Sequence, residues 1–182
     1  NIKRAKKMAD KTGGGILVIS EGVFGMRGEQ GRLKEIVAFK KEYNFRLLVD
    51  DAHGFGTLGV GGKGTGFEQG VQEDIDVYFA TFAKSMAGIG AFLEGDNDVI
   101  QFLQYNLRSQ MVAKSLPMAM VKGALKRLDM MRIMPELKEK LWENTNALQS
   151  GLRDAGFDLG TTQTCVQKYV YMRAQPLPQA VG

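Results

Sequence analysis

The sequence predicts an α/β fold whose central sheet is mostly parallel. Short apolar runs typical of buried strands alternate with segments in which apolar residues recur at helical spacing, as in strand–helix–strand units. Polar residues directly follow two of these runs, at positions where open α/β sheets bind ligands. Further along, the alternation gives way to two long helices and then strands. We therefore expect the sheet to be followed by helices and the start of a smaller α+β domain.

The first half of the chain can be assigned segment by segment. Residues 2–11 have the spacing of a helix, three glycines form a flexible joint, and residues 16–19 predict a short, fully buried strand. The later segments are a helix over 33–43, a strand over 45–49, a glycine-rich loop over 54–70 and a strand over 75–80.

The second half is mostly helical. A strand over 89–93 and a helix over 98–108 come first, and two long helices then begin near Pro117 and Pro135. Strands over 157–159 and 166–172 follow. The change of pattern indicates a domain boundary. We expect residues 1–125 to belong to the sheet domain and residues 126–182 to comprise linking helices and the start of the small domain.

Composition excludes several classes of protein. A chain of 182 residues with a formal net charge of +4 fits one domain with a sizeable core. The basic residues in the first helix alternate with apolar ones as on a solvated amphipathic helix, so we expect no nucleic-acid partner. A single cysteine, Cys165, suits a reducing compartment such as the cytoplasm. No apolar run is long enough to predict a transmembrane segment.

Two polar clusters form the candidate site. Asp50 and His53 follow the strand at 45–49, and Thr81 and Lys84 follow the strand at 75–80. Such an amine and carboxylate suit pyridoxal 5'-phosphate (PLP), because the amine condenses with the aldehyde and the carboxylate keeps the pyridine nitrogen protonated. At about 4 Å and an effective dielectric near 20, the carboxylate and the protonated pyridine nitrogen would attract each other by about 4 kcal/mol. Asp51 is then expected to lie behind the site or at the surface.

Each residue alone also has an ordinary structural interpretation. Lys84 could be a solvated surface lysine, Asp50 could cap a turn, and His53 could be a hydrogen-bonded structural residue. Their joint occurrence on successive strand ends is what favours a cofactor site.

Other motifs do not lead to a site. Residues 59–66 are glycine-rich like a phosphate-binding loop, but a Walker loop needs glycine and a hydroxyl residue where this chain has Thr57 and Gly64. We expect a long flexible connection there, with no helix after it. One histidine and one cysteine far apart predict no metal site, and no serine-hydrolase elbow is present.

Four motifs together carry a family resemblance. They are Glu21-Gly22-Val23-Phe24, Val49-Asp50-Asp51-Ala52-His53-Gly54, Thr81-Phe82-Ala83-Lys84-Ser85 and Ser115-Leu116-Pro117. In this order they resemble the α-oxoamine synthase family of fold-type I PLP-dependent enzymes, and the resemblance covers nearly the whole chain. It implies that the sheet belongs to the large domain of a fold-type I transferase.

The resemblance also implies a role for each site residue. Lys84 would condense with the cofactor aldehyde and move the substrate α-proton, and Asp50 would pair with the pyridine nitrogen. Ala52 would pack beneath the ring, Thr81 would donate to the phosphate, and His53 would hydrogen-bond near the ring hydroxyl and orient the substrate.

The implied reaction joins an amino acid to an acyl-CoA thioester, with decarboxylation, to give an aminoketone. The lysine motif followed by Ile89-Gly90-Ala91-Phe92 most resembles serine palmitoyltransferase, which ranks serine with palmitoyl-CoA first. The alternatives are 2-amino-3-ketobutyrate CoA ligase, which uses glycine, and 8-amino-7-oxononanoate synthase. A catalytically inactive scaffold subunit is the alternative from another class. Family sites lie between subunits, so a homodimer is expected of the full-length protein.

The chain also departs from the family pattern. Gly25 and Arg27 stand where serine and aspartate are usual, and Ala113 replaces a hydroxyl residue, so cofactor contacts are expected to be rearranged. The chain begins at Asn1 within a helical pattern, and we expect it to be a piece of a longer protein. The ring-stacking and carboxylate-binding segments of the family are absent from it. We therefore expect the piece alone to bind PLP weakly or not at all and to be inactive.

Overall fold

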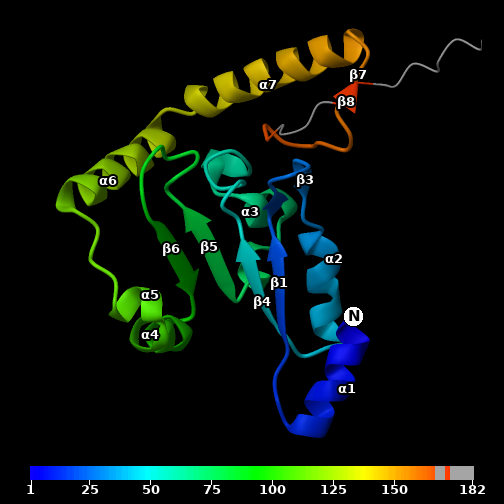
Figure 1. Ribbon diagram of the computed structural model, residues 1–182, viewed down its shortest axis with the longest axis vertical. Coiled ribbons are helices and arrows are strands. Elements are labelled where there is room, and N and C mark those ends of the chain that lie inside the picture. The colour runs from blue at the N-terminus through cyan, green and yellow to red at the C-terminus, as the bar shows by residue number, and fades with distance from the viewer. Residues whose placement is uncertain (167–170, 173–182) are drawn as a thin grey trace, which may run out of the picture.

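The computed structural model describes residues 1–166 and 171–172. Its main sheet has the strand order β1-β4-β5-β6. The strands β1 (Leu17–Glu21), β4 (Arg46–Asp50) and β5 (Val77–Thr81) are parallel, and β6 (Ala91–Gly95) runs antiparallel along one edge. The predicted α/β fold with a mostly parallel sheet is confirmed, and the strands fall where the apolar runs predicted them (Figure 1).

One face of this sheet carries the larger core. Leu47 and Val49 of β4 are fully buried on it, and they pack in one cluster with Leu33. The helices that cover this face are α1 (Ile2–Thr12) and α2 (Leu33–Ala38), the latter continued by a short 3₁₀ helix, η1 (Phe39–Lys41). Gly13 ends α1 in the left-handed conformation with φ +70°, which a residue without a Cβ adopts at little cost.

The prediction of a fully buried first strand was wrong. Leu17 and Ile19 of β1 are 56% and 66% exposed. Successive side chains of a strand point to opposite faces, and these two point to the face away from α1 and α2. Nothing among the described residues covers β1 on that side, so a continuous apolar run did not imply burial on both faces.

The glycine-rich segment is more structured than expected. It contains the 3₁₀ turn η2 (Val60–Gly62) and, after the run of glycines, a five-residue helix, α3 (Thr65–Gln69). A second 3₁₀ turn, η3 (Gln72–Asp74), comes directly after the segment. The expectation that no helix follows was therefore wrong. The backbone N–H of Thr65, which a helix start leaves without a partner inside the helix, donates to Asp51 Oδ2 at 2.7 Å.

A small hairpin was not foreseen. The two-residue strands β2 (Val23–Phe24) and β3 (Glu29–Gln30) pair antiparallel directly after β1. Strands this short are below the length at which alternation of apolar residues can be recognised.

The second half of the chain starts with two short helices beside the carboxyl end of the antiparallel strand β6, and its later elements lie toward the carboxyl ends of the parallel strands (Figure 1). Its elements are α4 (Asn97–Asn106), α5 (Arg108–Met111), α6 (Met118–Ile133), α7 (Glu136–Asp154), β7 (Phe157–Asp158) and β8 (Tyr171–Met172). Figure 1 shows α7 spanning the space beyond the ends of β1, β4 and β5. The expected strands at 157–159 and 166–172 appear as the short pair β7 and β8, and residues 167–170 lie outside the described residues. Among the helices of the described part, none is long and apolar enough to cross a membrane.

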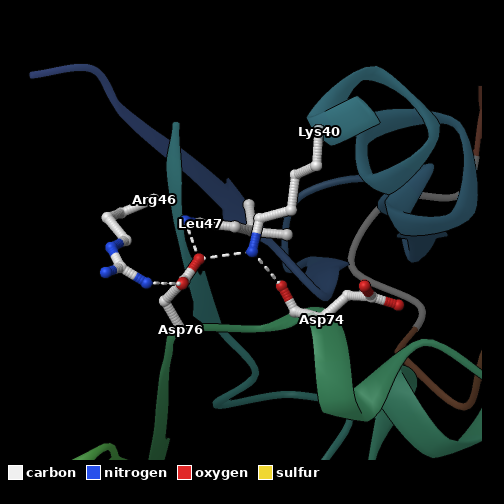
Figure 2. A network of polar contacts seen from close by, with 5 residues as sticks. All are labelled: Lys40, Arg46, Leu47, Asp74 and Asp76. Carbon is white, nitrogen blue, oxygen red and sulfur yellow. Dashed lines mark hydrogen bonds and ion pairs between the residues drawn. The ribbon is translucent and has the colours of Figure 1, made fainter. Parts of the chain in front are cut away.

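A polar network closes the opposite, amino-terminal edge of the sheet. Asp76, just before β5, accepts hydrogen bonds from Lys40 Nζ at 2.5 Å, Arg46 Nη1 at 2.8 Å and the backbone N–H of Leu47 at 2.6 Å (Figure 2). Lys40 also donates to the carbonyl oxygen of Asp74. One carboxylate thus ties η1, β4 and β5 together at the end of the sheet away from the candidate site.

Candidate active site

Asp50 and Thr81 lie on the same face of the sheet at neighbouring strand ends. In the parallel register Asp50 is paired with Phe79, and Thr81 lies two residues beyond Phe79 on β5, so both side chains point to one side. Asp50 is half-buried, and its Oδ1 accepts a hydrogen bond from the backbone N–H of Ala52 at 3.0 Å. Ala52 itself is buried, at 7% exposure.

Lys84 lies in a tight turn directly after β5. Thr81 Oγ1 donates to the carbonyl oxygen of Gly90 at 3.0 Å and accepts from the N–H of Ala83 at 3.1 Å. The N–H of Ala87 donates to the carbonyl oxygen of Lys84 at 3.0 Å. Ala87 has φ +43°, a left-handed conformation that a residue with a Cβ rarely adopts. The turn is thus held by its own hydrogen bonds while the side chain of Lys84 stays exposed.

A cavity of about 760 Å³ joins Lys84 to His53. Its other walls come from the loop after β4, from α6 and α7, and from Cys165, and methionines 130, 131 and 134 form an apolar side. Asp50, Ala52 and Thr81 are not among its lining residues. The structure therefore brings His53 and Lys84 together in one cavity, and Asp50 and Thr81 together on the adjoining sheet face.

Asp51 is buried, so of its two expected positions, behind the site or at the surface, the surface position is wrong. The residue is 0% exposed, and besides the N–H of Thr65 it accepts from Thr65 Oγ1 at 2.6 Å and from Tyr78 Oη at 2.9 Å. Burial raises the pKa of the Asp51 carboxyl, although these hydrogen bonds oppose the shift. Burial and the nearby Asp51 also raise the pKa of the Tyr78 hydroxyl.

Three glycines make room for this carboxylate. A Cβ at Gly22, Gly54 or Gly64 would lie 2.0–2.2 Å from an oxygen of Asp51. Asp51 therefore fastens the residues that follow β4 to β5 and α3. The sequence shows the second aspartate, but it does not show this contact, because the three glycines are far apart in the chain and surround Asp51 only after folding.

Two further residues of the site were missed by sequence reasoning. Ser85, which lines the cavity beside Lys84, donates from Oγ to the carbonyl oxygen of Phe55 at 2.7 Å and so joins the lysine turn to the loop after β4. Cys165 lies 81 residues beyond Lys84 in numbering and reaches the same cavity. Burial raises the pKa of its thiol, against a hydrogen bond with Thr57. Ser85 ends the lysine motif but was given no role, and the position of Cys165 is not marked by any pattern in the sequence.

The donor set fits PLP. Asp50 is an acceptor suited to a protonated pyridine nitrogen, and the amine of Lys84 is three residues beyond the hydroxyl of Thr81. Thr81 offers a hydroxyl near the turn, which suits a phosphate oxygen. All three belong to the carboxyl ends of two adjacent parallel strands, where ligands of open α/β sheets bind.

Comparison with known proteins shows which sequences and structures the chain resembles. It matches the family model described as aminotransferase class I and II over residues 4–180. It is 72% identical over 166 residues to cysteate-C-fatty acyltransferase of Capnocytophaga ochracea, across 91% of this chain and 40% of that protein. It is 42% identical over 148 residues to serine palmitoyltransferase of Sphingobacterium spiritivorum, across 81% of this chain and 37% of that protein.

A solved structure is similar as well. Serine palmitoyltransferase from S. paucimobilis, with a bound PLP–myriocin aldimine, superposes with a TM-score of 0.82 at 31% identity, across 97% of this chain and 46% of that one. The chain thus spans about 40% of the length of the curated relatives that it matches.

Proposed function

Since the chain belongs to the aminotransferase class I and II family, we propose that the full-length protein is a PLP-dependent C-acyltransferase of the α-oxoamine synthase type. It condenses an amino acid with an acyl-CoA thioester, with decarboxylation, to an aminoketone. The observation that carries the proposal is the placement of Asp50 and Thr81 on one sheet face at adjacent strand ends, with Lys84 three residues further on.

Each residue has a defined task in this proposal. Bound PLP supplies an electron sink for the carbanion at the substrate α-carbon. Asp50 holds a proton on the pyridine nitrogen, Thr81 donates to the phosphate, and Ala52 packs beneath the ring. Lys84 anchors the cofactor and moves the α-proton, and His53 orients the amino acid within the cavity that it shares with Lys84. The buried position of Ala52 and the common face of Asp50 and Thr81 support these assignments.

Cysteate with a long acyl thioester is the substrate pair that we propose first. The relative at 72% identity is named for cysteate and a fatty acyl group, whereas the serine enzyme is at 42%. Serine with palmitoyl-CoA, which the lysine motif ranks first, is the second candidate. The apolar methionine side of the cavity supports a long acyl chain over a short one, because unbranched methionines adapt to flexible apolar ligands.

We further propose that the full-length protein acts as a homodimer in the cytoplasm. The single cysteine among the 182 residues supports a reducing compartment. The chain would supply the PLP-binding large domain through residue 125, followed by linking helices and the start of the small domain.

Loading with PLP separates an enzyme from an inactive scaffold subunit. The full-length protein mixed with PLP should absorb in the visible range, and borohydride should fix the cofactor to Lys84. Lys84→Ala should abolish this adduct, whereas Lys63→Ala, an exposed lysine of the glycine-rich loop, should retain it. An identical spectrum with and without Lys84 would contradict the enzyme proposal.

An activity screen then identifies the substrates. Cysteate, serine, glycine and alanine are each paired with short and long acyl-CoA, and release of the CoA thiol is followed. The proposal expects the highest kcat/KM for cysteate with a long chain. A preference for glycine with acetyl-CoA would instead favour the ketobutyrate ligase activity.

A further inference from the structure

Gly25, in the turn of the β2–β3 hairpin, lies against the imidazole ring of His53. A Cβ built at Gly25 would lie 2.3 Å from His53 Nε2, 2.8 Å from Cδ2 and 3.1 Å from Cε1. The three nearest atoms therefore all belong to one ring, and Cβ contacts under 3.0 Å essentially never occur. Gly25 is not among the glycines with positive φ, so the ring excludes a side chain here and the backbone does not.

The backbone on both sides of this contact is anchored. The N–H of Gly25 donates to Glu21 Oε2 at 3.3 Å, and the N–H of Gly28 donates across the turn to the carbonyl oxygen of Phe24 at 2.8 Å. Glu21 in turn pairs with Asp50 in the β1–β4 register. On the other side, the carbonyl oxygen of His53 accepts from Thr57 Oγ1 at 2.9 Å. A side chain at position 25 would therefore displace the imidazole sooner than it would displace either backbone.

His53 also lines the cavity that contains Lys84. Any rotation of the ring changes the space between these two side chains. We infer that Gly25 is a positioning residue. Because it has no side chain, the imidazole of His53 can occupy its place beside the hairpin, and this position of the ring sets the space open to the amino-acid substrate. The inference rests on the proposed function and adds a determinant of amino-acid binding to it.

Gly25→Ala in the full-length, PLP-loaded protein tests the inference. The dissociation constants of L-cysteate and L-serine are measured from the visible absorbance of the bound cofactor, and kcat and KM are measured for the acyl transfer. We expect amino-acid binding to weaken roughly ten-fold, equivalent to about 1.4 kcal/mol. The KM for acyl-CoA and the urea midpoint of unfolding should change little.

Gly15→Ala is the matched control. Gly15 also has no positive φ, and a Cβ there would meet no atom within 4 Å. This variant should bind both amino acids as the parent protein does. If Gly25→Ala and Gly15→Ala give the same dissociation constants, the inference is wrong.

A second background shows whether Gly25 acts through His53. In His53→Ala the obstructing ring atoms are gone, so adding Gly25→Ala should leave amino-acid binding unchanged from His53→Ala alone. An additional loss in the double variant, or failure of the double variant to fold, would show that Gly25 acts through some other contact and would overturn the inference. If instead the parent protein shows no visible absorbance with PLP, the proposed function itself fails.

Discussion

At the scale of single residues, two aspartates with opposite environments determine how the strand ends are held. Asp51 is buried and accepts hydrogen bonds from the neutral groups of Thr65 and Tyr78. Asp76 instead accepts from the charged side chains of Lys40 and Arg46. The sequence showed two consecutive aspartates at the end of β4, Asp50 and Asp51, but it could not show which of them is enclosed. That choice depends on Thr65 and Tyr78, which approach Asp51 only after the loop and β5 have packed.

Asp51→Asn should destabilise the protein. An amide has only one acceptor oxygen, so its NH₂ group would replace an oxygen that accepts from Thr65 or Tyr78, and at least one hydroxyl or N–H that now donates to Asp51 would lose its acceptor. We expect a loss of about 1–3 kcal/mol in the free energy of unfolding, the usual cost of a buried polar group left without a partner. Urea denaturation of the full-length protein measures it. Asp74→Asn, at an exposed position, is the control, and equal midpoints for the two variants would contradict the role given to Asp51.

Asp76 should make stability depend on acid pH. Burial opposes ionisation of this carboxyl, but hydrogen bonds from Lys40, Arg46 and Leu47 lower its pKa overall. A carboxyl with a lowered folded-state pKa contributes stability above its unfolded pKa of about 3.9, and that contribution is lost as the pH falls through the folded-state value. Asp76→Asn should therefore lower the melting temperature at pH 7. The difference in melting temperature between the variant and the parent protein should become smaller below about pH 4. A difference in melting temperature that stays the same at every pH would contradict this role of Asp76.

At the scale of elements, periodicity located the strands and the long helices, because buried faces repeat every two or every 3.6 residues. It failed where burial depends on neighbours. β1 has the apolar run of a two-sided core strand, yet Leu17 and Ile19 are exposed on one face. The glycine-rich loop has no period at all, and its order comes from contacts with distant residues.

The helix α7 supplies two of those contacts. Trp142 Nε1 donates to the carbonyl oxygen of Thr57 at 2.9 Å, and Lys138 Nζ donates to that of Gly59 at 2.6 Å. Trp142→Phe keeps an aromatic ring and removes the N–H donor. We expect it to cost about 0.5–1.5 kcal/mol and to speed amide hydrogen exchange in the loop after β4, measured by mass spectrometry. Asn146→Ala, at an exposed position of α7, should leave that exchange unchanged; faster exchange in both variants would mean that the hydrogen bond is not the cause.

At the scale of the whole molecule, the candidate site is assembled from segments that are far apart in the chain. The strand ends that carry Asp50, Thr81 and Lys84 could be predicted, because strand order and loop length limit where they lie. The cavity wall from α6 and the approach of Cys165 could not, because they depend on how the second half of the chain packs on the first. The contact of Gly25 with His53 could not either, because it depends on how the β2–β3 hairpin packs against the residues after β4.

Thr164 is the clearest example of such a long-range connection. It is fully buried, and its Oγ1 donates to the carbonyl oxygen of Gly28 at 3.1 Å, across 136 residues of sequence. The same oxygen accepts from the N–H of Val166 at 3.2 Å, and the carbonyl oxygen of Thr164 accepts from Gln149 of α7 at 3.0 Å. One residue thus joins α7 to the β2–β3 hairpin beside the candidate site.

Thr164→Val should loosen this connection without changing side-chain volume. The carbonyl oxygen of Gly28 would keep the N–H of Gln163 as a donor, but the N–H of Val166 would lose its acceptor. We expect a loss of about 1–3 kcal/mol in the free energy of unfolding and faster hydrogen exchange in the hairpin. Thr12→Val, which alters an exposed hydroxyl at the end of α1, is the control. If both variants unfold at the same urea concentration, the hairpin is held by its own strand pairing, and the second half of the chain contributes little to the position of Gly25.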